Sequence, residues 1–236
     1  MRVMRKILMV LSLGLIAVTA SASVSNPENG KEYTLLERPQ PTDAGKKIEV
    51  IEFFAYYCPH CYVLDPILSD WVKKQGDNIA FKRIHVSDSR VVPHQKLFYS
   101  LEAMGKLEEL HTKIFNAFHV ERNRLQTDAE VLEFVTKAGI DKQKFLDVYN
   151  SFSIQSKLNR SALLMTSYQI DSWPKIAVDG RFMTSPVMAG VGLGRVSEQT
   201  QNQALVPVLD ALIAKIQKEK NVLAATDPVK VPAKKK

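Results

Sequence analysis

Cysteine is scarce in this sequence, since only Cys58 and Cys61 occur among 236 residues. So small a number excludes the framework of structural disulfides that many small exported proteins use. A passive bridge between the two is a weak alternative, because a disulfide stabilises more when it closes a longer loop, and this loop is about as short as a loop can be. A C-x-x-C pair after an apolar strand is instead typical of thiol–disulfide redox chemistry.

Long hydrophobic runs are scarce as well. The most extended apolar stretch, residues 7–18, has twelve residues, whereas a membrane-spanning helix needs about twenty. The small residues Ala20-Ser21-Ala22 that follow fit a signal-peptidase site. The preceding cations are Arg2, Arg5 and Lys6. We therefore expect residues 1–22 to be a cleaved signal peptide and the mature protein to be soluble and exported.

An excess of one charge is also missing from the body of the chain. The net charge of +7 falls to +4 without the three cations near the N-terminus, and the segment Asp227–Lys236 contributes +3 of the remainder. A body near +1 lacks the basic footprint of a nucleic-acid-binding protein. We expect residues 224–236, rich in proline and lysine, to form a disordered basic tail.

The order of predicted elements indicates an α/β fold. The apolar run Ile48–Ala55 predicts a strand buried on both faces, and a helix from Cys58 to about Lys74 leads to a second strand at Ile79–Val86. The other predicted strands are Tyr33–Leu36, Lys175–Val178 and Arg181–Thr184, the last two joined by an Asp179-Gly180 turn. Five consecutive helices are predicted at 94–104, 107–118, 128–138, 142–149 and 154–168, and a final amphipathic helix at 197–218.

Three features occur together: the run from Glu52 to Tyr62, which carries E-F-F and C-P-H-C, the block of helices, and Pro174 shortly before Ala177-Val178-Asp179-Gly180. In these features residues 31–218 resemble the DsbA family of periplasmic disulfide oxidases. The resemblance implies a thioredoxin-like fold with a large helical insertion at about 93–170, within a domain spanning 23–223. It also implies a periplasmic location and a redox-active disulfide as the only redox group.

The C-P-H-C motif carries the predicted catalytic residues. Cys58 at the helix N-terminus is the expected nucleophile, since free backbone N–H groups and the helix dipole favour its thiolate. Pro59 lacks an N–H that would have no partner at the first helical position, and His60 further stabilises the thiolate. Stabilising the reduced form makes the disulfide a stronger oxidant, so oxidation of substrates is the expected direction. The DsbA family is itself a reference example of this behaviour, so motif and resemblance are not independent.

Cys61 is the expected resolving thiol, one helical turn away on the same face and more buried. In the expected cycle, a substrate thiolate attacks Cys58 to form a mixed disulfide. The second thiol of the substrate then releases the reduced Cys58/Cys61 pair, with Cys58 as a good leaving group.

A carboxylate in the apolar strand, Glu52, is expected to be paired or protonated, because burying a free charge is costly. Its position matches the buried glutamate of the family, which implies a proton acceptor or electrostatic tuner near Cys61; a merely salt-bridged residue is the alternative. Asp65 is a weaker candidate for the same network. Arg83 stands where the family often has a lysine, and the two residues are not interchangeable.

The resemblance implies that Pro174 is the family's cis-proline, which faces the C-x-x-C pair and helps to bind substrate peptide. The family usually has valine or threonine before this proline, whereas this chain has Trp173. The Trp173 ring could face the substrate or cover the active site, or it could be a buried core aromatic.

No metal or haem site is expected, because the histidines His85, His94, His111 and His119 lack ligand-like spacing and Tyr62 follows Cys61. The partners implied are reduced exported proteins and, for reoxidation, a DsbB-like membrane quinone reductase, with the protein acting as a monomer. Two other functions stay open at this point: a disulfide reductase or isomerase, and a non-catalytic peptide-binding chaperone.

Overall fold

The structure is a computed structural model that describes residues 26–226, so the predicted signal peptide and residues 227–236 lie outside the described part. Within that part the strands form one five-stranded sheet in the order β1-β5-β4-β2-β3. The strands are β1 Thr34–Leu35, β2 Ile48–Phe54, β3 Ile79–His85, β4 Lys175–Val178 and β5 Phe182–Thr184. The central β2 runs parallel to β3 and antiparallel to β4. Each strand lies where the sequence predicts one.

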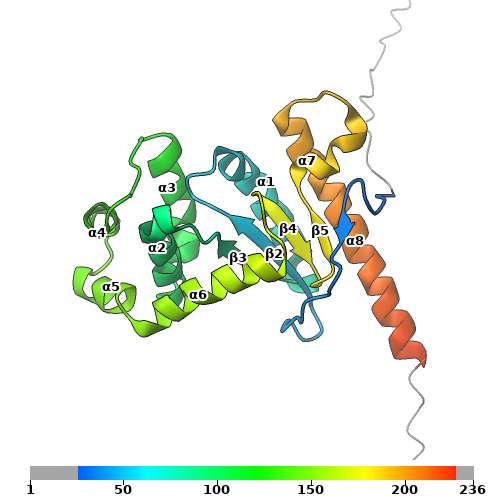
Figure 1. The fold of residues 1–236 in the computed structure, drawn as a ribbon, viewed down its shortest axis with the longest axis horizontal. Coiled ribbons are helices and arrows are strands. Elements are labelled where there is room, and N and C mark those ends of the chain that lie inside the picture. Colours follow the sequence, from blue (N-terminus) through cyan, green and yellow to red (C-terminus); the bar gives the residue numbers. More distant parts are fainter. Residues whose placement is uncertain (1–25, 227–236) are drawn as a thin grey trace, which may run out of the picture.

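The helices follow the predicted order. Those between β2 and β4 are α1 Pro59–Gln75, α2 Val92–Ala103, α3 Leu107–His119, α4 Asp128–Lys137, α5 Lys142–Tyr149 and α6 Phe152–Ser167. The last five form a block to one side of the sheet, with α6 returning the chain to β4 (Figure 1). After β5 come the short helix α7 Pro186–Ala189, which was not predicted, and α8 Glu198–Thr226. Short 3-10 helices lie at Gly76–Asn78, Ser89–Val91 and Val191–Leu193. The thioredoxin-like sheet with a large helical insertion is therefore confirmed.

Two hydrophobic cores lie on opposite faces of the sheet. All seven residues of β2 are buried, and the strand contributes apolar side chains to both cores. Ile48 and Val50 pack against α1 and α8, whereas Ile51 and Phe53 pack toward the helical insertion. This two-sided burial is why the strand is apolar almost without interruption, as is typical of a central strand.

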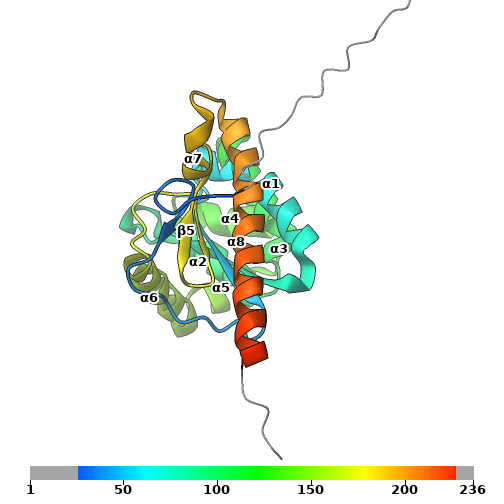
Figure 2. The same ribbon diagram turned by 90° about the vertical axis from the view of Figure 1, so that its right-hand side faces the viewer.

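The final helix, α8, extends along the side of the molecule (Figure 2). Its predicted apolar face is buried against the sheet and α1; the face consists of Leu205, Val208, Leu209, Leu212, Ile213 and Ile216. The predicted end at Lys218 is wrong, because the helix continues to Thr226. Across residues 26–226, no helix combines the length and apolar character needed to cross a membrane.

A tight turn joins β4 to β5, as the Asp179-Gly180 pair predicts. Both residues have positive φ, 53° and 64°, as a two-residue hairpin turn requires. A side chain at Gly180 would bring its Cβ to 2.2 Å from the backbone oxygen of Gln40. Glycine is therefore needed here for close approach as well as for backbone conformation.

Candidate active site

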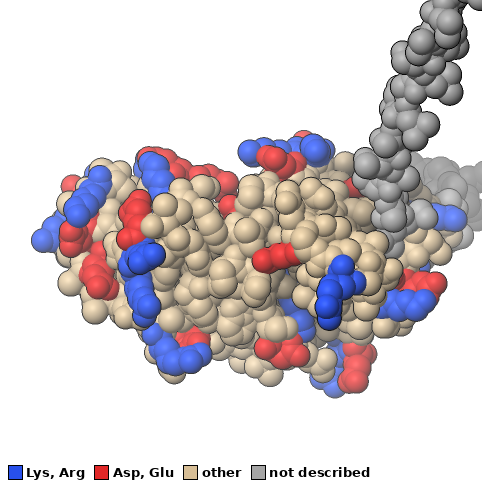
Figure 3. Space-filling view, turned by 90° about the horizontal axis from the view of Figure 1, so that it is seen from above, with Lys and Arg blue, Asp and Glu red and all other residues tan. Residues whose placement is uncertain are grey.

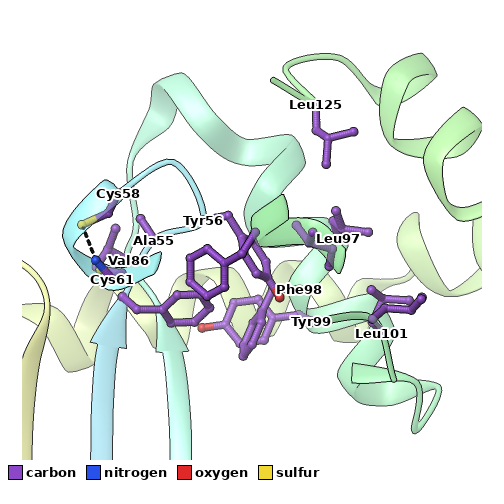
Figure 4. Packing of buried hydrophobic residues seen from close by; sticks show 14 of the residues in the cluster. Ala55, Tyr56, Cys58, Cys61, Val86, Leu97, Phe98, Tyr99, Leu101 and Leu125 are labelled. Atoms are coloured by element: carbon purple, nitrogen blue, oxygen red, sulfur yellow. Dashed lines mark hydrogen bonds between the residues drawn. The ribbon is translucent and has the colours of Figure 1, made fainter. Parts of the chain in front are cut away.

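Cys58 caps the N-terminus of α1 directly after the loop that follows β2. Its backbone is extended, with φ −81° and ψ 114°, and Pro59 occupies the first turn. The backbone N–H of Cys61 donates to Cys58 Sγ over 3.2 Å (Figure 4). Both cysteines are free thiols. Cys58, which reacts as a negatively charged thiolate, thus lies where the N-terminus of α1 offers unpaired N–H donors.

Several groups lower the pKa of Cys58. The chief one is a hydrogen bond from the Cys61 side chain, followed by bonds from the backbone N–H groups of Cys61 and His60 and by the charge of the His60 ring, while burial opposes them. The sequence predicted the helix terminus and His60, but not that the second thiol would make the largest contribution.

Cys61 has the opposite environment. It is fully buried, and this burial raises the pKa of its thiol, an effect reinforced by the hydrogen bond to Cys58 and by the charges of Cys58 and Glu52. In the reduced state Cys58 therefore tends to be the thiolate, and Cys61 keeps its proton.

Trp173 and Pro174 lie opposite the nucleophile and are joined by a cis peptide bond. Cys58 Sγ lies 3.7 Å from the carbonyl oxygen of Trp173 and donates to it as a thiol. The Trp173 ring is half-buried and meets the ring of Tyr57 edge to face, with 6.3 Å between centroids. It thus lies at the margin of the core, where one edge packs and the other faces the groove beside the active site.

That groove has a volume of about 450 Å³ and lies between the Trp173–Pro174 segment and the start of α8. Its lining includes His60, Trp173 and Pro174, together with Val187 from α7 and Glu198 from α8. Its exposed surface is mainly apolar, and two charged pairs, His60–Glu198 and Asp171–Lys175, also line it.

A buried ionic cluster lies beneath the cysteines, at the junction of β2, β3 and α1. Arg83 Nε donates to Glu52 Oε2 over 2.9 Å, and Arg83 Nη2 donates to Asp65 Oδ1 over 3.0 Å. All three are at most 9% exposed. One buried cation faces two carboxylates, so one carboxylate retains a proton readily. Burial raises the pKa of Glu52 to about 7, against the opposing charge of Arg83.

The sequence missed a group of histidines that extends this cluster. His111 on α3 has Nε2 3.2 Å from Asp65 Oδ1, and its Nδ1 forms a 2.9 Å hydrogen bond with Tyr56 Oη. The Tyr56 backbone N–H donates to His85, and its carbonyl accepts a bond from His119. Three histidines therefore hold the residue two positions before Cys58. Only the folded arrangement of β3 and α3 brings them there, so no local spacing could have signalled it.

The same region is rich in aromatic side chains. Tyr56 packs among the rings of Phe54, Phe98 and Phe115, with centroid separations between 5.1 and 6.3 Å. Figure 4 shows this packing continuing from Cys58 and Cys61 toward α2. The helical insertion is thus packed directly against the loop that delivers the nucleophile. Nowhere in residues 26–226 do three or more His, Cys, Asp or Glu side chains gather in a way that could hold a metal ion.

Comparison with known proteins identifies the family. Residues 49–197 match the family model of the DSBA-like thioredoxin domain. The thiol:disulfide interchange protein DsbA of Burkholderia cepacia is 42% identical over 221 residues, covering 92% of this chain and all of the relative. DsbA of Pseudomonas aeruginosa PAO1 is 33% identical over 181 residues, covering 76% of this chain and 86% of the relative. A crystal structure of Pseudomonas aeruginosa DsbA superposes with a TM-score of 0.73 at 32% identity, covering 81% of this chain and 95% of that one. The chain therefore belongs to the DsbA-like thioredoxin-domain family and is a DsbA-like thiol:disulfide oxidoreductase.

Proposed function

We propose that the protein donates its Cys58–Cys61 disulfide to reduced, newly exported proteins in the periplasm. The observation that carries this direction is the contrast between the two thiols, one with a lowered and one with a raised pKa. A stabilised Cys58 thiolate favours the reduced protein, so the disulfide tends to accept electrons from substrates.

The reaction proceeds by two thiol–disulfide exchanges. A substrate thiolate attacks Cys58 Sγ, a substrate–Cys58 bond forms, and the Cys58–Cys61 bond breaks with its electron pair on Cys61. The second substrate thiolate then attacks the substrate sulfur, and Cys58 leaves as a thiolate. The substrate loses two electrons and gains a disulfide, and the protein gains the two electrons as one thiolate and one thiol.

Glu52 supplies the proton in the first exchange. Cys61 leaves into a buried site where its thiolate is unfavourable, so it needs a proton as it departs. Glu52 has a pKa of about 7, which suits a group that gives and regains a proton near neutral pH. Burial is the largest cause of that raised pKa, while the charge of Arg83 lowers it and the charge of Asp65 raises it further.

Trp173, Pro174 and the adjoining groove bind the substrate polypeptide. The carbonyl of Trp173 lies beside Cys58 Sγ, so an extended peptide placed along this segment would bring its cysteine to the nucleophile. On the face that Figure 1 shows uppermost, the charged side chains lie mostly toward the edges and the middle is largely uncharged (Figure 3). Such a surface suits substrates of varied sequence, because it selects against neither charge.

The remaining assignments of this proposal rest on the sequence and on the family. Residues 1–22 direct export, and residues 23–223 form the catalytic domain with its insertion at about 93–170. The predicted basic tail, 224–236, overlaps the end of α8, because residues 224–226 still belong to that helix. The protein acts as a monomer without a further cofactor, and a DsbB-like membrane quinone reductase reoxidises the Cys58/Cys61 pair.

Cysteine variants test the proposal. Cys58→Ser and Cys61→Ser should both fail to oxidise a reduced, unfolded substrate, because neither can form the Cys58–Cys61 disulfide. When scrambled, disulfide-bonded ribonuclease is supplied, the Cys58 thiolate of Cys61→Ser should attack one of its disulfides and accumulate as a mixed disulfide, because the resolving thiol is gone. Oxidation and isomerisation are measured by refolding reduced and scrambled ribonuclease. Strong isomerase activity with little oxidation would contradict the proposed direction. Complementation of a null strain by Cys58→Ser would instead indicate a peptide-binding chaperone.

A further inference from the structure

An ion pair at the active site connects two distant parts of the chain. His60 Nδ1 lies 2.6 Å from Oε1 of Glu198, the first residue of α8. The side chains are 66% and 44% exposed, and both line the groove. Asp171 and Lys175, which line the same groove, pair with each other at 2.6 Å, and neither is among the groups that shift the pKa of His60.

We propose that Glu198 is a positioning residue of the thiol–disulfide reaction, one that holds the His60 ring in place and in its protonated form beside the Cys58 thiolate. This inference deepens the proposed function and rests on it. The carboxylate accepts the Nδ1–H bond and fixes the ring, which is the usual way in which a carboxylate orients a histidine. The same hydrogen bond raises the pKa of His60, and the charge of His60 in turn lowers the pKa of Cys58.

The ion pair between His60 and Glu198 changes how many protons the protein takes up when its Cys58–Cys61 disulfide is reduced. When two glutathione molecules reduce the disulfide, two electrons enter the protein and one glutathione disulfide forms. One thiol proton ends on Cys61. If His60 is already protonated, the other proton goes to solvent, so above the pKa of Cys58 the equilibrium constant rises about tenfold per pH unit.

Without Glu198, His60 would be neutral in the oxidised protein near neutral pH. The new thiolate at Cys58 would then draw the second proton onto His60, and none would be released. The equilibrium constant would be nearly independent of pH between the His60 pKa values of the oxidised and reduced forms. Glu198 therefore extends strong oxidising behaviour to higher pH.

The variant Glu198→Gln tests this inference through the equilibrium of the full protein with glutathione between pH 5 and pH 8. At pH 5, where His60 is protonated in both the variant and the wild type, the equilibrium constant for reduction of Glu198→Gln by glutathione should be no lower than that of the wild type. At pH 8 it should be about two- to fivefold lower, the range that exposed ion pairs allow, with a flattened profile between. The His60 titration followed by NMR should move to lower pH.

Two further variants separate this role from a structural one. Glu133→Gln removes an exposed carboxylate that pairs with Lys137 on α4, far from the cysteines in sequence, and should leave the profile unchanged. In a His60→Asn background, Glu198→Gln should have no further effect. An unchanged profile in Glu198→Gln, or an effect that persists without His60, would overturn the inference. A wild-type constant like that of thioredoxin would refute the proposed direction instead, whatever Glu198→Gln does to the profile.

Discussion

Cys58 and Cys61 have opposite chemical environments although they are one helical turn apart. The difference arises because the helix N-terminus offers its N–H groups to Cys58, while Cys61 points into the core. The sequence could predict this much, since a C-x-x-C pair after a buried strand fixes both positions. It could not predict Glu198, because that contact joins residues 138 positions apart.

At the residue scale, Glu52→Gln should change how stability depends on pH. Glu52 has a folded pKa of about 7, above its ordinary value of 4.5, so the folded state binds its proton more tightly than the unfolded state. Its contribution is therefore fully present below pH 4.5 and is lost as pH rises to about 7. The loss amounts to about 3 kcal/mol.

Urea unfolding of the reduced proteins at pH 4 and pH 8 measures this effect. From pH 4 to pH 8, the free energy of unfolding of Glu52→Gln relative to that of the wild type should increase by about 3 kcal/mol. Comparing each variant with itself across pH removes the constant effect of the lost Arg83 contact. Parallel pH profiles for the two proteins would show that Glu52 does not titrate in this range.

At the scale of elements, the buried cluster joins four segments of the fold. Arg83 comes from β3, Glu52 from β2 and Asp65 from α1, while His111 from α3 brings the helical insertion into the same network. Glu52 could be singled out from the sequence because a charge in an apolar strand is unusual, and Asp65 because it follows Cys61 by four residues on the same helical face. The histidines could not, because a histidine on an apolar helix face has no distinctive spacing.

Replacing Arg83 tests this junction. Arg83→Met leaves two carboxylates buried without their cation and should lower the free energy of unfolding by about 3–5 kcal/mol at pH 8. Arg83→Lys should cost less, since one ammonium keeps the charge but cannot reproduce the two-sided guanidinium contact. Denaturant unfolding provides the measurement.

Arg90→Met is the matched control, because Arg90 is exposed and pairs with Asp88 two residues away. It should change stability by less than about 0.5 kcal/mol. Equal losses in Arg83→Met and Arg90→Met would show that the buried cluster does not join these elements.

At the scale of the molecule, the order of strands and helices could be predicted because β2 and the hairpin at Asp179-Gly180 carry strong local patterns. The end of α8 and the short helix α7 were not predicted. The apolar periodicity of α8 stops at Ile216, but Glu219 pairs with Lys215 and with Arg181, which supports the next turn.

The helix α7 was missed because it has only four residues. Its signal was present, since Ser185 caps the backbone N–H of Met188 and Pro186 occupies the first turn. This pattern of serine followed by proline is a helix-start signal. It matters here because α7 forms one wall of the groove beside Pro174.

The direction of electron flow, from substrate thiols to the Cys58–Cys61 disulfide, is a property of the whole molecule. The most direct measurement is the reduction potential of the Cys58–Cys61 disulfide, from its equilibrium with glutathione at pH 7. We predict a value well above the potential of thioredoxin, about −270 mV, because the Cys58 thiolate is stabilised and the Cys61 thiolate is not. A value at or below that of thioredoxin would contradict the account and assign the protein to the reductases.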